Sequence, residues 1–146
     1  MKRIISLLLA VMTVLALTAC GGKTTTVDAQ SLAKALAEKT AFESELSAVS
    51  KEELGYYFQL PAKCDAAAYM SSGSTAEEIF VIECYDGASA AALRTSMQDF
   101  LDSQKTEMER YLPAEVDRIN GAIFETYGTC VVLCVTSDTD TARSVI

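Results

Sequence analysis

Apolar residues recur at two different spacings along the chain after residue 27. Helical spacing predicts a helix over about 29–41, capped by Asp28, and a longer helix over about 88–110. Alternating spacing predicts a strand from Glu78 to Tyr85. Shorter patterns predict strands within 42–49 and at 66–70, 122–127 and 129–136, and short helices after Ser50, Pro113 and Asp138.

The order of these elements indicates a fold class. Strand pairs followed by helices favour α+β, with an antiparallel sheet of about four or five strands and helices packed mainly on one face. The segment 129–136 has apolar residues at both alternating positions. It is therefore expected to be a central strand covered on both sides, or covered on one side and shielded by the aromatic residues of 56–60.

The first 20 residues have the pattern of an export signal. Lys2 and Arg3 precede an uncharged stretch from Ile4 to Leu17, which is shorter than the roughly 20 apolar residues that span a bilayer. The residues Leu17-Thr18-Ala19-Cys20 resemble the lipobox of bacterial lipoproteins. The resemblance implies a diacylglyceryl cysteine at Cys20, with cleavage between Ala19 and Cys20. The alternative is an ordinary secretory signal followed by an incidental cysteine.

This interpretation divides the chain into a removed signal peptide (1–19), a lipidated flexible tether (20–27) and a single α+β domain (28–146). It predicts a palmitate-type lipid anchor on the extracytoplasmic face of the bacterial cell membrane, within the cell envelope. Two acyl chains anchor a protein stably, whereas one binds only marginally.

Charge narrows the possible partners. The whole chain has a net charge of −8, and removal of Lys2 and Arg3 leaves −10. A domain with this negative charge repels nucleic acid and anionic lipid headgroups, so no nucleic-acid partner is expected. The lipid must therefore hold the domain at the membrane. The chain contains no histidine, which excludes Ser-His and Cys-His catalysis and the commonest zinc and haem ligands.

Four cysteines remain beside Cys20: Cys64, Cys84, Cys130 and Cys134. If Cys130 and Cys134 share one strand, they lie about 13 Å apart, beyond the roughly 7 Å that a disulfide spans. Cys84 could pair across strands with either of them; the favoured alternative is that all four are small buried apolar residues. Only Cys130 and Cys134 have the close spacing of a zinc-binding cysteine pair, and they lie in an apolar strand. Neither a metal site nor a cofactor is therefore expected.

Few polar residues form a recognisable site. Glu77 and Glu78 are adjacent on a strand and should point to opposite faces, so they cannot work as a paired acid and base. One is expected to be solvated and the other to make an edge contact. Asp138 is better explained as a helix cap than as part of a calcium loop. No catalytic residue is assigned.

The remaining candidates are binding loops at about 56–61 and 71–76. Their candidate residues, with the strand start that follows, are Tyr56, Tyr57, Ser72, Ser74, Glu77 and Glu78. They suggest a non-catalytic module that binds an envelope protein, a peptide or a small ligand. The alternatives are an envelope hydrolase or transferase using carboxylates such as Glu78 or Asp138, and a purely structural lipoprotein.

Several motifs together resemble one known family. They are the segment Ser74–Ile79, the following long helix with Gln104, the sequence Tyr111-Leu112-Pro113 and the strand after Gly128. They are similar to a bacterial lipoprotein family, domain of unknown function 4358, whose members are small acidic lipoproteins mainly of clostridia-type Gram-positive bacteria. The resemblance implies no catalytic residues, because the family has no assigned activity.

Overall fold

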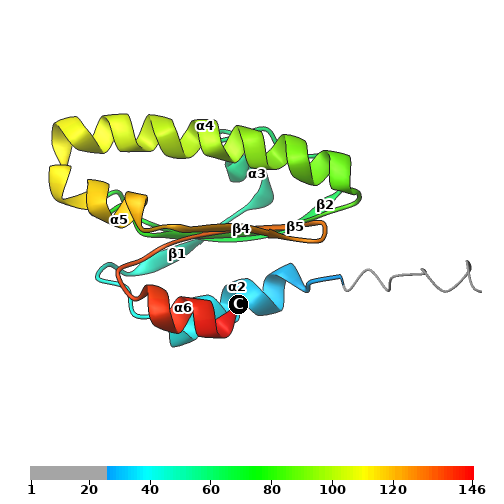
Figure 1. Ribbon diagram of the computed structural model, residues 1–146, viewed down its shortest axis with the longest axis horizontal. Coiled ribbons are helices and arrows are strands. Elements are labelled where there is room, and N and C mark those ends of the chain that lie inside the picture. The colour runs from blue at the N-terminus through cyan, green and yellow to red at the C-terminus, as the bar shows by residue number, and fades with distance from the viewer. Residues whose placement is uncertain (1–25) are drawn as a thin grey trace, which may run out of the picture.

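The computed structural model describes residues 26–146, which form a five-stranded antiparallel sheet between two layers of helices (Figure 1). The strands lie in the order β1-β2-β3-β5-β4. They are β1 (Leu46–Val49), β2 (Cys64–Ser71), β3 (Glu78–Cys84), β4 (Ile123–Tyr127) and β5 (Cys130–Val135). The predicted α+β class with an antiparallel sheet is confirmed. The predicted signal segment and Cys20 lie outside the described residues.

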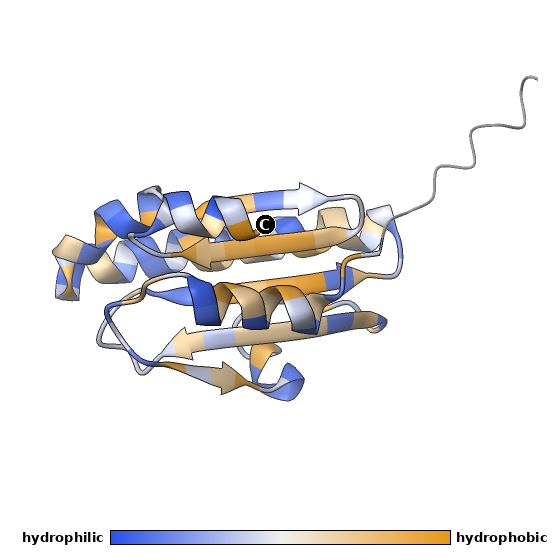
Figure 2. Ribbon diagram, turned by 90° about the horizontal axis from the view of Figure 1, so that it is seen from below, coloured by the Kyte–Doolittle hydropathy of each residue, from blue (hydrophilic) through white to orange (hydrophobic). Residues whose placement is uncertain are grey.

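The strands β3 and β5 form the buried centre of the sheet. Every residue of β5 is buried, and so is every residue of β3 except Glu83. Figure 2 shows the hydrophobic colour concentrated on these two strands. The apolar residues at both alternating positions of 129–136 therefore correspond to a strand covered on both sides, the first of the two arrangements that the sequence suggested.

Helices cover both faces of the sheet, rather than mainly one face as expected from the sequence. One face carries α3 (Lys51–Leu54), α4 (Gly87–Tyr111), the 3₁₀ turn η2 (Pro113–Glu115) and α5 (Val116–Asn120). The other carries α2 (Ala29–Lys39) and α6 (Thr139–Val145), which contact each other (Figure 1). The reason is that β3 and β5 are apolar on both sides, so each side needs a cover.

Two separate cores result from this arrangement. On the α4 side, Phe80 packs edge-on against Phe58 and Phe100, with ring centroids 5.3 and 5.9 Å apart. On the other side, Ala29 and Ala33 face the sheet from α2 and are fully buried. Their small side chains let α2 lie close to the strands.

Local capping residues set the starts of several helices. The Asp28 carboxylate accepts the Ser31 N–H at 2.9 Å, and Ser50 with Glu53 forms the expected capping box. Asp138 precedes α6 as predicted, but its carboxylate accepts the N–H of Ala41 at 3.1 Å. Asp138 therefore ties the end of α2 to the start of α6.

The sheet separates the cysteines into two groups. Cys84 belongs to the core under α4, with Cys64 packed against it, whereas Cys130 and Cys134 belong to the core under α2 and α6. The expectation that Cys84 could pair with Cys130 or Cys134 is therefore wrong, because the sheet lies between them. Within residues 26–146 all four are free thiols, and all except the half-buried Cys64 are buried.

Candidate functional site

Arg118 of α5 joins three carboxylates at the end of the sheet where β3 begins and β5 ends. Its Nη2 lies 2.6 Å from Glu43, its Nη1 contacts Glu115, and its Nε lies 3.8 Å from Glu77. Nε also donates to the Ser137 hydroxyl at 3.0 Å. The Arg118 side chain is only 10% exposed. We call this group, Arg118 with Glu43, Glu77, Glu115 and Ser137, the Arg118 cluster, and the surrounding end of the sheet the Arg118 end.

The carboxylates of this cluster also hold the backbone. Glu77 accepts the N–H groups of Glu43 and Ser44 at 2.9 and 2.8 Å and the Thr75 hydroxyl at 3.1 Å. Glu115 accepts the N–H of Ala76 at 2.8 Å. Burial opposes the charge on Arg118, but its hydrogen bonds to Glu43 and Glu115 outweigh burial and raise its pKa. The cluster therefore joins the loop before β1, the start of β3 and α5.

Glu78 points to the opposite face and has a different environment. Gln104 of α4 donates to Glu78 Oε2 at 3.2 Å. Among residues 26–146, neither Glu78 Oε1 nor Gln104 Oε1 has a hydrogen-bond partner. Burial raises the pKa of Glu78 to about 8, although the bond from Gln104 lowers it in part. Glu78 is therefore mostly a neutral acid at pH 7.

The sequence prediction for the two glutamates is confirmed in one respect and wrong in the other. Glu77 and Glu78 do face opposite sides of the sheet, as adjacent strand residues must. Neither is solvated, because their exposed fractions are 2% and 1%. The loop before β1 covers Glu77, and α4 covers Glu78. Strand alternation predicts which face a side chain occupies but not whether another segment covers it.

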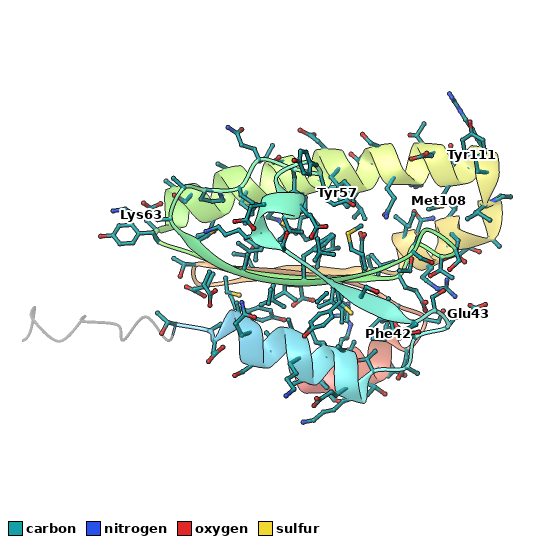
Figure 3. The ribbon with its side chains drawn as sticks, turned by 180° about the vertical axis from the view of Figure 1, so that it is seen from behind. Phe42, Glu43, Tyr57, Lys63, Met108 and Tyr111 are labelled. Atoms are coloured by element: carbon teal, nitrogen blue, oxygen red, sulfur yellow. The ribbon has the colours of Figure 1, made fainter. Side chains whose placement is uncertain are left out.

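Two open hollows flank the Arg118 cluster and share Ser137. The larger, of about 430 Å³, is lined by Ala41, Phe42, Glu43, Glu77, Ser137 and Asp138. The smaller, of about 310 Å³, is lined by Ala114, Asp117, Arg118, Gly121, Thr136, Ser137 and Thr139. The Ala41 N–H is the largest influence that lowers the pKa of Asp138, which keeps a negative charge in the larger hollow. Figure 3 shows Phe42 and Glu43 at this end and Lys63 at the opposite one.

The structure brings together only some of the residues proposed for binding. The Ser74 hydroxyl lies 3.0 Å from that of Ser44, beside Glu77, and Ser72 is exposed in the turn before it. Tyr56 is 87% exposed, and Tyr57 packs edge-on against Phe100 at 5.8 Å. Figure 3 places Tyr57 beside α4, away from Glu43. The two predicted loops are therefore not one surface.

Arg118, Glu115 and Glu43 were not recognised from the sequence. Glu115 and Arg118 are three positions apart, a spacing that often joins opposite charges on a helix. The bond from Arg118 to Glu43 joins residues 75 positions apart, which no local pattern reveals. The sequence does indicate Gln104, because it is a polar residue on the otherwise apolar face of the long helix. Such a residue indicates a buried polar partner.

The chemistry available in the described part of the chain is limited. Glu78 lies under α4, whereas Asp138 precedes α6 on the other face, so these two acids do not converge. Within residues 26–146, no group of three or more cysteine or acidic side chains is arranged to hold a metal ion. The Arg118 cluster holds backbone segments together, and the groups it leaves accessible line the two hollows.

Comparison with known proteins identifies a family. A family model described as a domain of unknown function (DUF4358) matches residues 38–136. The chain belongs to this family. The match includes the whole sheet, α4 and the Arg118 cluster except Ser137, but only the end of α2 and none of α6. No curated protein and no solved structure matches the chain.

Proposed function

We propose that this chain is a lipid-anchored binding module on the extracytoplasmic face of the bacterial cell membrane. In this proposal residues 1–19 are a signal peptide and Cys20 carries diacylglycerol. The support is the lipobox-like sequence Leu17-Thr18-Ala19-Cys20 after a charged start and an apolar stretch. In the part of the chain that is described, no helix has the length and hydrophobicity needed to span a membrane.

The first described residues lie at the opposite end of the sheet from the Arg118 cluster. The N–H of Val27 donates to Glu83 at 3.3 Å, so the described part of the chain begins near the end of β3. The Arg118 cluster lies at the beginning of the same strand. At about 3.3 Å per residue, the strand separates the two ends by roughly 20 Å. In this proposal the Arg118 end is the end of the domain farther from Val27, and therefore from the tether, and it is free to face a partner.

The observation that carries the binding role is the pair of open hollows at the Arg118 end. They offer the Asp138 and Glu43 carboxylates, the Ser137 hydroxyl and the half-buried ring of Phe42. A basic segment of an envelope protein or peptide suits this surface, because it supplies positive charge and N–H donors. The carboxylate hydrolase or transferase needs two acids in one cleft, and Glu78 and Asp138 face different helical layers. Glu43, Glu77 and Asp138 do line one hollow, but each carboxylate accepts a hydrogen bond from the protein itself.

The first prediction tests the anchor. Cells that express the chain and are fed labelled palmitate are expected to incorporate the label into the protein, and Cys20→Ser is expected to abolish it. The thioether needs the Cys20 sulfur, which serine lacks. Membrane fractionation of both forms gives a second readout. Incorporation of the label into Cys20→Ser at the wild-type level would rule out Cys20 as the lipid site.

The second prediction tests the binding surface with matched aromatic positions. Benzoylphenylalanine in place of Phe42 is expected to crosslink a discrete partner when intact membranes are irradiated. The same probe at Tyr85, which is 75% exposed at the tether end, is expected to give no such product. Gel shift and mass spectrometry identify the product. Equal crosslinking from both positions, or none from either, would count against a binding surface at the Arg118 end.

A further inference from the structure

Cys64 and Cys84 lie directly opposite each other on the antiparallel strands β2 and β3. The N–H of Cys84 donates to Thr129 O at 3.0 Å, which lies on the β5 side of β3. In a strand, the N–H and C=O of one residue point to the same side. The backbone groups of Cys84 are therefore directed away from β2, and Cys64 with Cys84 is a non-hydrogen-bonded pair.

The other end of the same hairpin gives the same assignment. The N–H of Ser71 donates to Glu77 O at 3.1 Å, so these two residues form a hydrogen-bonded pair. The two kinds of pair alternate along an antiparallel ladder. Counting from Ser71 to Cys64 along the observed register again makes the cysteine pair non-hydrogen-bonded.

This geometry suits a covalent bond between the two sulfurs. Non-hydrogen-bonded partners have Cα atoms about 4.5 Å apart, within the roughly 4.4–6.8 Å range of disulfides. Both side chains lie on the α4 side of the sheet. The Cys64 thiol donates to Pro61 O at 3.3 Å, a weak hydrogen bond that a change of side-chain rotamer would release.

The pair is also open to reagents. A hollow of about 260 Å³ is lined by Lys63, Cys64, Asp65, Glu83, Cys84 and Tyr85. Cys64 is half-buried and Cys84 is 4% exposed, so a reagent meets Cys64 first. Cys130 and Cys134 are fully buried on the other face.

We propose that Cys64 and Cys84 form a disulfide that joins β2 to β3 at the tether end of the sheet, with a small-molecule disulfide as oxidant. The Cys64 thiolate attacks oxidised glutathione, forms a mixed disulfide and releases one glutathione thiolate. The Cys84 thiolate then attacks the Cys64 sulfur and releases the second. The two cysteines lose two protons and two electrons, and oxidised glutathione is reduced to two glutathione molecules.

The order of the two attacks follows from burial. Burial, followed by the nearby Cys64, Glu83 and Asp86, raises the pKa of Cys84 to about 11. Cys84 therefore has little thiolate at neutral pH and is the resolving cysteine rather than the first nucleophile. The inference concerns the folded domain alone and does not depend on the lipid at Cys20.

The experiment treats the full-length chain in detergent with oxidised glutathione, quenches it with acid, then unfolds and alkylates it. Cys64 and Cys84 fall in a single tryptic peptide, residues 64–94, because Lys63 precedes it and no lysine or arginine occurs before Arg94. This peptide is expected to be unalkylated and lighter by two hydrogen atoms. The peptide carrying Cys130 and Cys134 is expected to bear two alkyl groups.

The Cys84→Ala variant is the matched control, because it keeps Cys64 and removes the resolving thiol. It is expected to stop at a glutathione adduct on Cys64. Wild-type chain unfolded in urea is expected to form the bridge more slowly, because the register no longer aligns the thiols. A wild-type product that stays a glutathione adduct or dithiol, or that links Cys64 to Cys130 or Cys134, would overturn the proposal.

Discussion

Replacing Arg118 with methionine is expected to lower the free energy of unfolding by about 3–5 kcal/mol, as removal of one partner from a buried ion pair does. Arg118 faces Glu77 and Glu115, whose side chains are 1% and 12% exposed. Methionine keeps an apolar stem of similar length but leaves both carboxylates without their cation. Urea unfolding at pH 7, followed by circular dichroism, measures the change.

A surface arginine supplies the control for this substitution. Arg143 pairs with Glu125 at 2.7 Å, but its side chain is 55% exposed. Exposed pairs contribute little to stability, so Arg143→Met is expected to leave the urea midpoint nearly unchanged. Similar midpoints for Arg118→Met and Arg143→Met would show that the Arg118 cluster does not stabilise the fold. Adding Glu115→Gln to Arg118→Met should recover part of the loss, because it removes one unpaired charge.

Much of the fold could be predicted because the signals are local. The capping box of Ser50 and Glu53 lies within four residues, and Asp28 caps a helix whose apolar spacing is regular. The central position of β5 follows from the apolar residues on both of its faces. The second helical layer was missed because α2 covers the sheet largely with alanines and α6 is short.

The site could be predicted only in part, because its contacts are distant in the sequence. Strand alternation correctly separates Glu77 from Glu78, but burial depends on what covers the strand. The backbone donors to Glu77 come from residues 33 and 34 positions earlier, and Gln104 follows Glu78 by 26 positions. Tertiary packing brings these distant residues together. Composition and the spacing within one helix or strand do not indicate such contacts.

Glu78 is expected to make the stability of the domain fall as pH rises. Its pKa changes from about 4.5 in an unfolded chain to about 8 in the folded protein. Between these values the unfolded state has lost the proton and the folded state retains it, so raising the pH favours unfolding. The stabilisation is fully present below about pH 4.5 and is lost as pH rises through about 8. The expected slope is about 1.4 kcal/mol per pH unit.

Glu78→Gln should remove this slope, because glutamine resembles the protonated acid and cannot ionise. Its amide oxygen can still accept the hydrogen bond that Gln104 now donates to Glu78 Oε2. The variant and wild type should have similar stability near pH 5, and the variant should be the more stable by a growing margin towards pH 8. Urea unfolding of both proteins across this range measures the difference, in which the other titrating groups largely cancel.

The neighbouring Glu77, which directly precedes β3, is expected to respond in the opposite way. Glu77→Gln is expected to lower stability across the whole range by about 1–3 kcal/mol, the cost of leaving buried donors unsatisfied. Its amide keeps one oxygen and replaces the other with an NH2 group. One of the two backbone N–H groups that the carboxylate now accepts, from Glu43 and Ser44, would then face a donor, and the carboxylate that faces Arg118 would be lost. Parallel pH curves for Glu78→Gln and wild type would mean that Glu78 ionises normally in the folded protein. Opposite responses of the two variants at pH 8 would identify Glu77 as the charged structural group and Glu78 as the buried neutral one.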